Sequence, residues 1–490
     1  MRPRLIPALS LWWLVACGVP KTAPTAGDTA ARIDRVMTGL RPALAIKGEA
    51  PTRWSLAERM ERHHVPGMSI AIIDSGRIVW ARGYGVKEAG GRDSVTTETL
   101  FQAGSISKPT FAVGVMRLVE DGKLNLDDDV NQRLTTWKVP ENKFTVTEKV
   151  TLRRLLSHSA GLTVHGFMGY EAGAPVPTIT QILDGIKPAN SAPIRVDTFP
   201  GAMFRYSGGG TTVAMLVVTD LLKTPFQDFM KGTVLGPAGM SHSTYEQPLP
   251  AAMAPNAATG TDPDGKPVKG KHNTYPEMSA AGLWTTPSDL AALAIELQQT
   301  YAGKSTRLIN QATFKQMLEV QKAPLGIGYW LEGAGPDLEF YHGGSDVGFI
   351  AAFSAYAERG QGVMIMTNGD NGGNLIAELI PSIADEFRWP SHHPSEKVTV
   401  TSDPKVLAEV AGTYRLATGG PTLIEAAMTV EGGKLFAEAK GGLSKDELLA
   451  DSDSTFFTRT SGIPIVFERD ATKKVTGVTI DGAIKGKKVK

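Results

Sequence analysis

Strand-like runs at both ends of a long helical region constrain the fold of this chain most. Near one end, two β-rich runs are joined by Asp74-Ser75-Gly76, which is a hairpin signal. The strand-like runs are 68–73 and 77–84, and later 326–331, 338–342, 348–356 and 362–367. Strands at both ends with helices between them predict an α+β fold, in which one sheet is built from both ends and a helical lobe is inserted.

Helical periodicity covers most of the region between these strands, and it also precedes and follows them. Thr286-Pro287-Ser288-Asp289 is a good helix start, with proline in the first turn. The predicted helices are 31–40, 55–64, 110–121, 151–157, 211–222, 225–234, 287–299 and 374–389.

The last 85 or so residues alternate apolar and polar side chains between turn residues, as the half-buried strands of a small all-β domain do. The runs are 433–439, 454–460, 463–469 and 475–480. We therefore divide the chain into a main domain (33–390), a polar linker (391–404) and a C-terminal β domain of barrel or sandwich type (405–490).

The N-terminal residues have the pattern of an export signal. Arg2 and Arg4 precede an apolar run, 5–16, which is too short for the roughly 20 residues of a membrane span. The run ends in Leu14-Val15-Ala16-Cys17, which resembles a bacterial lipoprotein lipobox. We expect a signal peptide over 1–17, a lipid anchor on Cys17, a tether over 18–32 and a place on the periplasmic or outer side of the cell envelope. The alternative is an ordinary secretory signal with an incidental cysteine.

Charge and cysteine content exclude several classes of function. The chain has 51 basic and 50 acidic side chains, and we find no basic stripe that would bind nucleic acid. Cys17 is the single cysteine, so an intramolecular disulfide or a cysteine-based zinc site is excluded. We expect no metal and no cofactor.

Ser105 and Lys108 lie one helical turn apart at a predicted helix start. Residues three apart share a helical face, so the ammonium can reach the hydroxyl. A serine hydroxyl is a poor nucleophile unless a base or cation activates it. Ser105 is therefore the candidate nucleophile, with an N-cap serine as the structural alternative.

Two glycine-rich segments later in the chain are typical of close approach between backbone and another group. Tyr206 precedes Ser207 and three glycines, and a phenol near a lysine can serve as a base toward serine. His342 precedes Gly343-Gly344-Ser345. The backbone N–H groups of Ser345 and Ser105 could form an oxyanion hole, with Gly344 beside the substrate. We expect His158 to order its own loop.

Together these segments resemble the serine β-lactamase and penicillin-binding-protein superfamily, in the branch with class C β-lactamases, D-alanyl-D-alanine carboxypeptidases, D-aminopeptidases and related esterases. The resemblance covers about 55–389. It rests on Val65 to Ala71, Ser105 to Lys108, Leu155 to Leu162, Tyr206-Ser207-Gly208, Gly282 to Leu290 and His342-Gly343-Gly344.

The resemblance implies an antiparallel sheet flanked by helices, an acyl-enzyme on Ser105, proton transfer supported by Lys108, and Tyr206 as general base. His342 stands where the family has lysine or histidine. Gly208 departs from the common Tyr-x-Asn pattern, and the missing carboxamide favours esters or an unusual amide. Gly343 replaces a usual threonine, which removes a hydroxyl that could bind a substrate carboxylate.

We therefore expect a lipid-anchored serine hydrolase acting on small-molecule or peptide substrates that are esters or D-amino-acid amides. The alternatives are D-Ala-D-Ala carboxypeptidase or β-lactamase activity proper, and a non-catalytic penicillin- or peptidoglycan-binding or sensor protein.

Overall fold

The computed structural model describes residues 26–42, 44–417, 423–439, 443–482 and 484–489. The predicted signal peptide, the lipid anchor at Cys17 and the first part of the tether lie outside the described residues.

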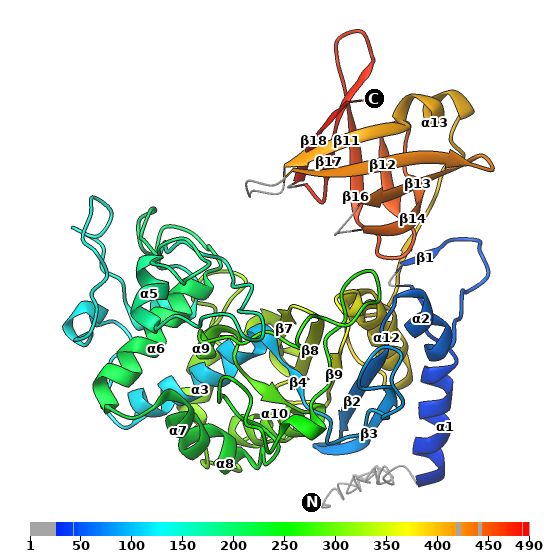
Figure 1. Cartoon of the computed structure of the whole chain (residues 1–490). Helices are drawn as coiled ribbons and strands as arrows, with labels where there is room; N and C mark the ends of the chain where they lie inside the picture. Colours follow the sequence, from blue (N-terminus) through cyan, green and yellow to red (C-terminus); the bar gives the residue numbers. More distant parts are fainter. Residues whose placement is uncertain (1–25, 43, 418–422, 440–442, 483, 490) are drawn as a thin grey trace, which may run out of the picture.

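A six-stranded antiparallel sheet forms the centre of the main domain, with strand order β3-β2-β9-β8-β7-β6 (Figure 1). Its strands are β2 (Gly67–Asp74), β3 (Arg77–Gly85), β6 (Trp330–Glu332), β7 (Glu339–Asp346), β8 (Phe349–Tyr356) and β9 (Gly362–Thr367). The N-terminal hairpin pairs with the last strand, with Ile70 opposite Ile365. The predicted α+β fold, with one sheet built from both ends, is confirmed.

Helices cover both faces of this sheet, because alternate side chains of its central strands point to opposite sides. Ile70 and Ile72 of β2 pack into a core shared with α1 (Ala26–Met37), α2 (Leu56–Arg62) and α12 (Gly372–Glu386). Ala71 and Ile73 pack into the larger core shared with α3 (Ser107–Glu120) and α10 (Pro287–Tyr301). β2 is therefore apolar on both faces.

The first helix starts earlier than predicted. α1 begins at Ala26, inside the segment 18–32 that the sequence predicts to be a tether. Alanines and an acidic residue in the first turn favour a helix there. Arg35 also donates a hydrogen bond to Glu386 of α12 at 3.0 Å, which ties the helix to the main domain.

The inserted helices gather on one side of the sheet, in cyan and green (Figure 1). They are α4 (Leu152–Leu156), α5 (Ile179–Asp184), α6 (Gly208–Leu222), α7 (Phe226–Met230), α8 (Gly236–Ala238), α9 (Met278–Ala281) and α11 (Gln311–Met317). A short ladder of β4 (Phe101–Gln102) and β5 (Trp284–Thr285) leads the chain into α3.

The C-terminal domain is a closed eight-stranded antiparallel barrel, so the all-β, barrel-like prediction is confirmed. The strands are β11 (Gly412–Ala417), β12 (Leu423–Glu431), β13 (Lys434–Ala439), β14 (Leu443–Ala450), β15 (Thr455–Thr458), β16 (Pro464–Arg469), β17 (Val475–Ile480) and β18 (Ile484–Lys488). Its interior is filled by apolar side chains such as Tyr414, Phe456 and Phe467.

The segment between the two domains is partly structured. β10 (Ser395–Lys397) pairs in parallel with β1 (Leu44–Ile46), and α13 (Pro404–Val410) precedes the barrel. Arg459 of the barrel donates to Glu49 at 2.6 Å. The barrel thus lies against the N-terminal part of the chain (Figure 1). Within the described ranges, the helices are all too short or too polar to cross a bilayer.

Candidate active site

Ser105 lies in the 3₁₀ turn Gly104–Ile106, which leads directly into α3. Gly104 has φ +50°, a left-handed conformation that L side chains rarely adopt. A Cβ on Gly104 would also lie 2.5 Å from the backbone nitrogen of Ser345. The turn therefore needs glycine before the serine, both for its conformation and for its contact with β7.

Lys108 is buried and points back at Ser105. Its Nζ donates to Ser105 Oγ at 2.9 Å and to the carbonyl oxygen of Ala280 at 2.8 Å. The second bond holds the ammonium in place, because Ala280 belongs to α9. The side chain is thus part of the site and is not an exposed helix lysine.

The buried hydroxyl of Ser107 fixes the other side of the turn that carries Ser105. Ser107 Oγ donates to the carbonyl oxygen of Gly104 at 2.6 Å and accepts from the N–H of Leu283 at 3.0 Å. Both partners are backbone groups, so the start of α3 is joined to the segment that follows α9.

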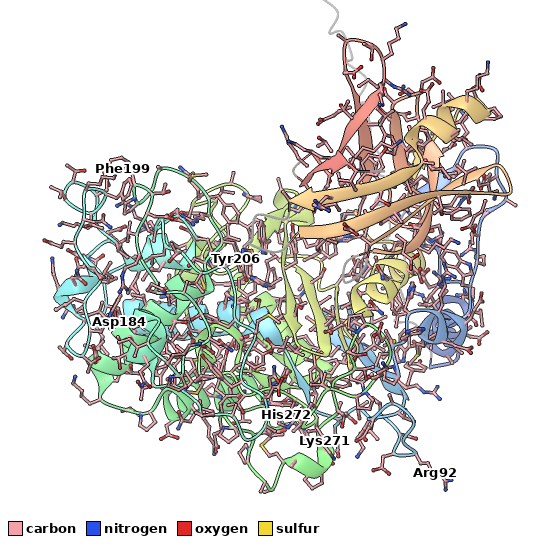
Figure 2. All side chains as sticks on the ribbon, turned by 45° about the horizontal axis from the view of Figure 1, so that its top comes forward. Arg92, Asp184, Phe199, Tyr206, Lys271 and His272 are labelled. Carbon is pink, nitrogen blue, oxygen red and sulfur yellow. The ribbon has the colours of Figure 1, made fainter. Side chains whose placement is uncertain are left out.

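Tyr206 places its ring beside Lys108, with 5.1 Å from Nζ to the ring centroid. It lies between the helical lobe and the barrel in Figure 2. The ring is also close to those of His158 (4.1 Å between centroids), His165 (4.8 Å) and His342 (6.1 Å), and it stacks parallel to Trp330 at 6.5 Å.

The residue after Tyr206 begins α6. Ser207 Oγ accepts from the N–H of Gly210 at 2.8 Å, so the three glycines form the first turn of the helix. The predicted helix began later, at Thr211. This N-cap bond satisfies a backbone donor at the helix start and explains why the helix extends back to Gly208.

The His158 side chain bonds to the segment that begins α6, whereas the sequence led us to expect that it orders its own loop. Its Nδ1 accepts from the backbone N–H of Ser207 at 3.2 Å. Burial, with a contribution from the Lys108 ammonium, lowers the pKa of His158 well below its usual value, so the ring is neutral. A neutral ring with an unprotonated Nδ1 is what this hydrogen bond requires.

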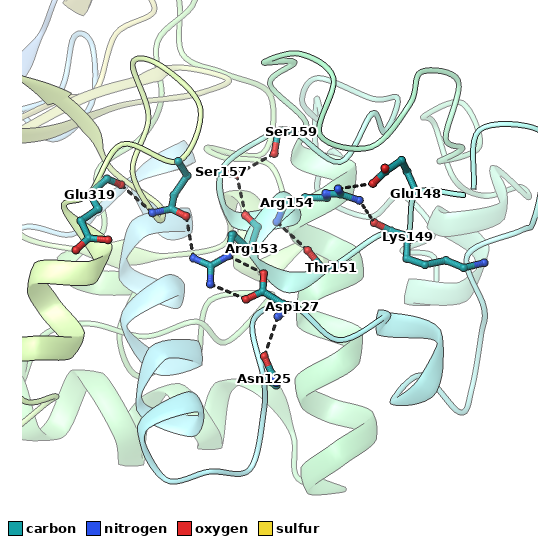
Figure 3. A network of polar contacts seen from close by, with 11 residues as sticks. Asn125, Asp127, Glu148, Lys149, Thr151, Arg153, Arg154, Ser157, Ser159 and Glu319 are labelled. Atoms are coloured by element: carbon teal, nitrogen blue, oxygen red, sulfur yellow. Dashed lines mark hydrogen bonds and ion pairs between the residues drawn. The ribbon is translucent and has the colours of Figure 1, made fainter. Parts of the chain in front are cut away.

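A polar network holds the loop that carries His158 (Figure 3). Arg153 of α4 makes two hydrogen bonds of 2.7 Å to the carboxylate of Asp127, and donates to Gln321 at 2.8 Å. Ser157 Oγ lies 3.0 Å from Ser159 Oγ, and also donates to the carbonyl oxygen of Arg153. The network fixes both flanks of His158.

His342 lies on β7 and is buried. Its Nδ1 is 2.6 Å from the carbonyl oxygen of Gly343, and a carbonyl only accepts, so Nδ1 carries the proton. Burial, with the Lys108 ammonium, lowers the pKa of His342 to about 3. The ring is therefore neutral at physiological pH. Its Nε2 is an acceptor that has no partner among the described residues.

The 3₁₀ turn of Ser105 packs backbone to backbone against β7. A Cβ on Gly344 would lie 1.9 Å from the carbonyl oxygen of Ala103. This approach brings Ser345, with its backbone N–H, next to the nucleophile turn. The structure thus brings together Ser105, Lys108, Tyr206, His342, Gly344 and Ser345, the residues selected from the sequence.

Sequence reasoning missed three residues of this region. Trp330 stacks on Tyr206, Asp346 is a buried carboxyl group near Lys108, and Glu277 is a buried carboxyl group that acts on Asp346. Asp346 directly follows Ser345, a position that could have drawn attention to it. Glu277 and Trp330 carry no such signal. The described residues contain no group of three or more side chains that could hold a metal ion.

The Gly344 contact gives a matched pair of variants. Gly344→Ala should displace β7 from the Ser105 turn, because the added methyl overlaps a backbone oxygen, and we expect hydrolysis to fall about a hundredfold. Gly343→Ala is the control, since its nearest atom would lie 3.9 Å away. Ester hydrolysis rates of the two purified variants test this. Equal losses would contradict the close-approach account.

The sequence is similar to those of two bacterial proteins. Penicillin-binding protein 4 of Amycolatopsis lactamdurans is 25% identical over 382 residues, covering 73% of this chain and 95% of the relative. Protein flp of Staphylococcus aureus (strain N315) is 22% identical over 354 residues, covering 70% of this chain and 66% of the relative.

Solved structures share the fold. The octameric penicillin-binding protein homologue from Pyrococcus abyssi has a TM-score of 0.60 at 20% identity, covering 88% of this chain and 98% of that one. SurE with D-Leu has a TM-score of 0.57 at 20% identity, covering 95% and 100%. D-alanine carboxypeptidase AmpC from Burkholderia cenocepacia has 0.54 at 19%, covering 73% and 100%.

A family model described as beta-lactamase matches residues 55–385, which is more than half of the chain. The protein therefore belongs to the serine β-lactamase and penicillin-binding-protein superfamily of hydrolases.

Proposed function

We propose that this protein is a serine hydrolase that forms an acyl-enzyme on Ser105 and acts on esters or on amides of D-amino acids. The observation that carries the proposal is the 2.9 Å contact between Lys108 Nζ and Ser105 Oγ, made by a buried lysine whose position is fixed by a second hydrogen bond. A lysine with only a structural role would not need to donate to the hydroxyl of Ser105, which is partly buried.

The reaction follows from this geometry. Ser105 Oγ attacks the acyl carbonyl, and the N–H groups of Ser105 and Ser345 stabilise the oxyanion that develops. The proton of Ser105 passes either to Lys108 in its neutral amine form or to Tyr206 as a phenolate beside the Lys108 ammonium, since the Tyr206 ring lies 5.1 Å from Lys108 Nζ. It then goes to the leaving group, and water releases the acyl group from Ser105 in a second step.

The surroundings of Gly208 support esters over ordinary peptide amides. A Cβ at this position would lie 3.1 Å from the carbonyl oxygen of His165 and 3.2 Å from the ring of Phe167. The loop of residues 163–167 therefore occupies the space that an asparagine side chain would need. A site without that carboxamide has lost a donor for the substrate amide.

The neutral state of His342 supports substrates without a carboxylate. A lysine at this position would offer a cation to an anionic substrate group, whereas this imidazole offers an acceptor. Penicillins and D-Ala-D-Ala peptides both carry a carboxylate. They remain the alternative substrates, because similar proteins are named as a penicillin-binding protein and a D-alanine carboxypeptidase. The structure of SurE with D-Leu is consistent with D-amino-acid acyl groups.

Ser105→Ala is expected to lower hydrolysis of p-nitrophenyl acetate by roughly a thousandfold or more, because the nucleophile is removed. Ser241→Ala is the matched control, since this serine is exposed and its hydroxyl lies 3.3 Å from Nδ1 of His242, outside the candidate site. Unchanged ester turnover in Ser105→Ala would contradict the proposal. Labelling by a fluorescent penicillin without ester turnover would favour the binding or sensor alternative.

A pair of matched esters tests the neutral-substrate inference. One carries a terminal carboxylate and the other its primary amide, and we expect kcat/KM to favour the amide about tenfold or more, since an unpaired carboxylate is costly to desolvate. His342→Lys should reverse or reduce this preference. A preference of the unaltered enzyme for the carboxylate would contradict the inference.

Export and anchoring form a separate part of the proposal, supported by the sequence of residues 1–17. If Cys17 carries lipid, the full chain expressed in a bacterial host sediments with membranes and incorporates labelled palmitate. Cys17→Ser should leave the protein in the soluble fraction and unlabelled. Equal membrane recovery of both forms would contradict a lipid anchor at this residue.

A further inference from the structure

Two buried carboxyl groups next to the site take no part in the steps above. The side chain of Glu277 is 0% exposed and that of Asp346 is 4% exposed. None of their four oxygens has a hydrogen-bond partner among the described residues. Other buried carboxylates of this chain are well paired. Glu339, for example, accepts from Ser354 at 2.6 Å and from His392 at 2.9 Å.

The two carboxyl groups lie on the segments that hold the reacting groups in place. Asp346 ends β7 and directly follows Ser345, the oxyanion donor. Glu277 precedes α9, whose Ala280 carbonyl accepts from Lys108. The backbone N–H of Val347 donates to the Tyr275 hydroxyl at 3.0 Å, which joins the two segments.

An ionised carboxylate is very costly in such a place, because it has lost its water and no cation or side-chain donor replaces that water. Burial raises the pKa of Glu277 to about 8. Burial also raises the pKa of Asp346 well above its usual value, while the Lys108 ammonium and the backbone N–H of Gly104 oppose this rise. Glu277 therefore holds its proton at pH 7, and burial favours the protonated form of Asp346.

The other ionisable groups nearby do not cancel the rise that burial causes in the pKa values of Glu277 and Asp346. Lys108 from α3 acts on Asp346, Tyr275 from the segment before α9 faces both carboxyl groups, and Tyr170 faces Glu277. Asp370, from the segment before α12, acts on Tyr275. With Lys108 already bound to Ser105 and Ala280, no cation among the described residues forms an ion pair with either carboxyl group.

We propose that Glu277 and Asp346 are positioning residues that work in their neutral, protonated form and that switch the enzyme off when they ionise. Each is uncharged while their two segments pack together, joined by the bond from the Val347 N–H to the Tyr275 hydroxyl. Loss of a proton to solvent places a negative charge beside Ser345, where the oxyanion must develop. It also draws the Lys108 ammonium away from Ser105.

This inference rests on the proposed acyl-enzyme at Ser105, but its first test does not use activity. In infrared difference spectra at pH 7, wild type minus Glu277→Gln and wild type minus Asp346→Asn should each show the C=O band of a protonated carboxyl group. Glu339→Gln is the matched control, and its difference spectrum should show a carboxylate. Carboxylate bands for both Glu277 and Asp346 would overturn the inference and leave the proposed function intact.

The thermal stability of the same variants, measured as Tm, gives a second test. A neutral amide replaces a neutral acid in Glu277→Gln and Asp346→Asn, so we expect their Tm at pH 7 to stay near the wild-type value. Glu339→Gln should lower Tm, because it breaks a buried pair with His392. A loss in Glu277→Gln as large as that in Glu339→Gln would contradict a neutral Glu277.

Kinetics test the link to catalysis. The kcat/KM of the wild type for a neutral ester should fall on the alkaline side as Glu277 loses its proton. In Glu277→Gln this fall should move up by about one pH unit or more, because an amide cannot ionise. Glu277→Ala should lose activity at all pH values. An alkaline limb that is unchanged in both Glu277→Gln and Asp346→Asn would overturn the switch.

Discussion

The close approach of the Ser105 turn to β7 is the constraint on which the site depends. Two backbones meet with no side chain between them, and this needs glycine at 104 and 344, where a Cβ would reach 2.5 Å and 1.9 Å from backbone atoms. The contact sets the distance between the nucleophile and the N–H of Ser345. It also brings β7 of the central sheet to the start of α3, which carries Lys108. The sheet, the helical lobe and the candidate reacting groups therefore meet at this contact.

Burial shifts the pKa values of the ionisable groups around this contact. Lys108 is the cation that reaches Ser105, while His158 and His342 are held neutral by burial and by that same ammonium. Burial raises the pKa of Glu277 and of Asp346 for the corresponding reason. A site with one cation and several neutral donors and acceptors is suited to an oxyanion that develops only during the reaction. It is less suited to a substrate that brings its own carboxylate.

The sequence predicted the sheet, the barrel and the residues that gather at the candidate site, because each depends on local patterns. The barrel strands alternate apolar and polar residues, the central strands of the sheet are short apolar runs, and Ser105, Lys108, Tyr206 and His342 lie in ordered motifs. The sequence did not predict the start of α1 at Ala26, because the proline, threonine and glycine content of 18–32 favours a tether over the local helix signal of its alanines and Asp28. The pair of Arg35 with Glu386, which ties α1 to the main domain, joins residues far apart in the sequence. The sequence also could not predict the role of Glu277 or Trp330. Their importance arises from burial and stacking against segments distant in sequence, and no local pattern distinguishes them from surface residues.

The central claim is that Ser105 becomes acylated, and mass spectrometry of an acid-quenched reaction tests it most directly. After brief exposure to a slowly hydrolysed ester, the intact protein should gain the mass of one acyl group, located on the peptide that contains Ser105. The Ser105→Ala variant should gain none. An adduct located on another residue, or turnover of the ester with no adduct on Ser105 at any quench time, would contradict the account.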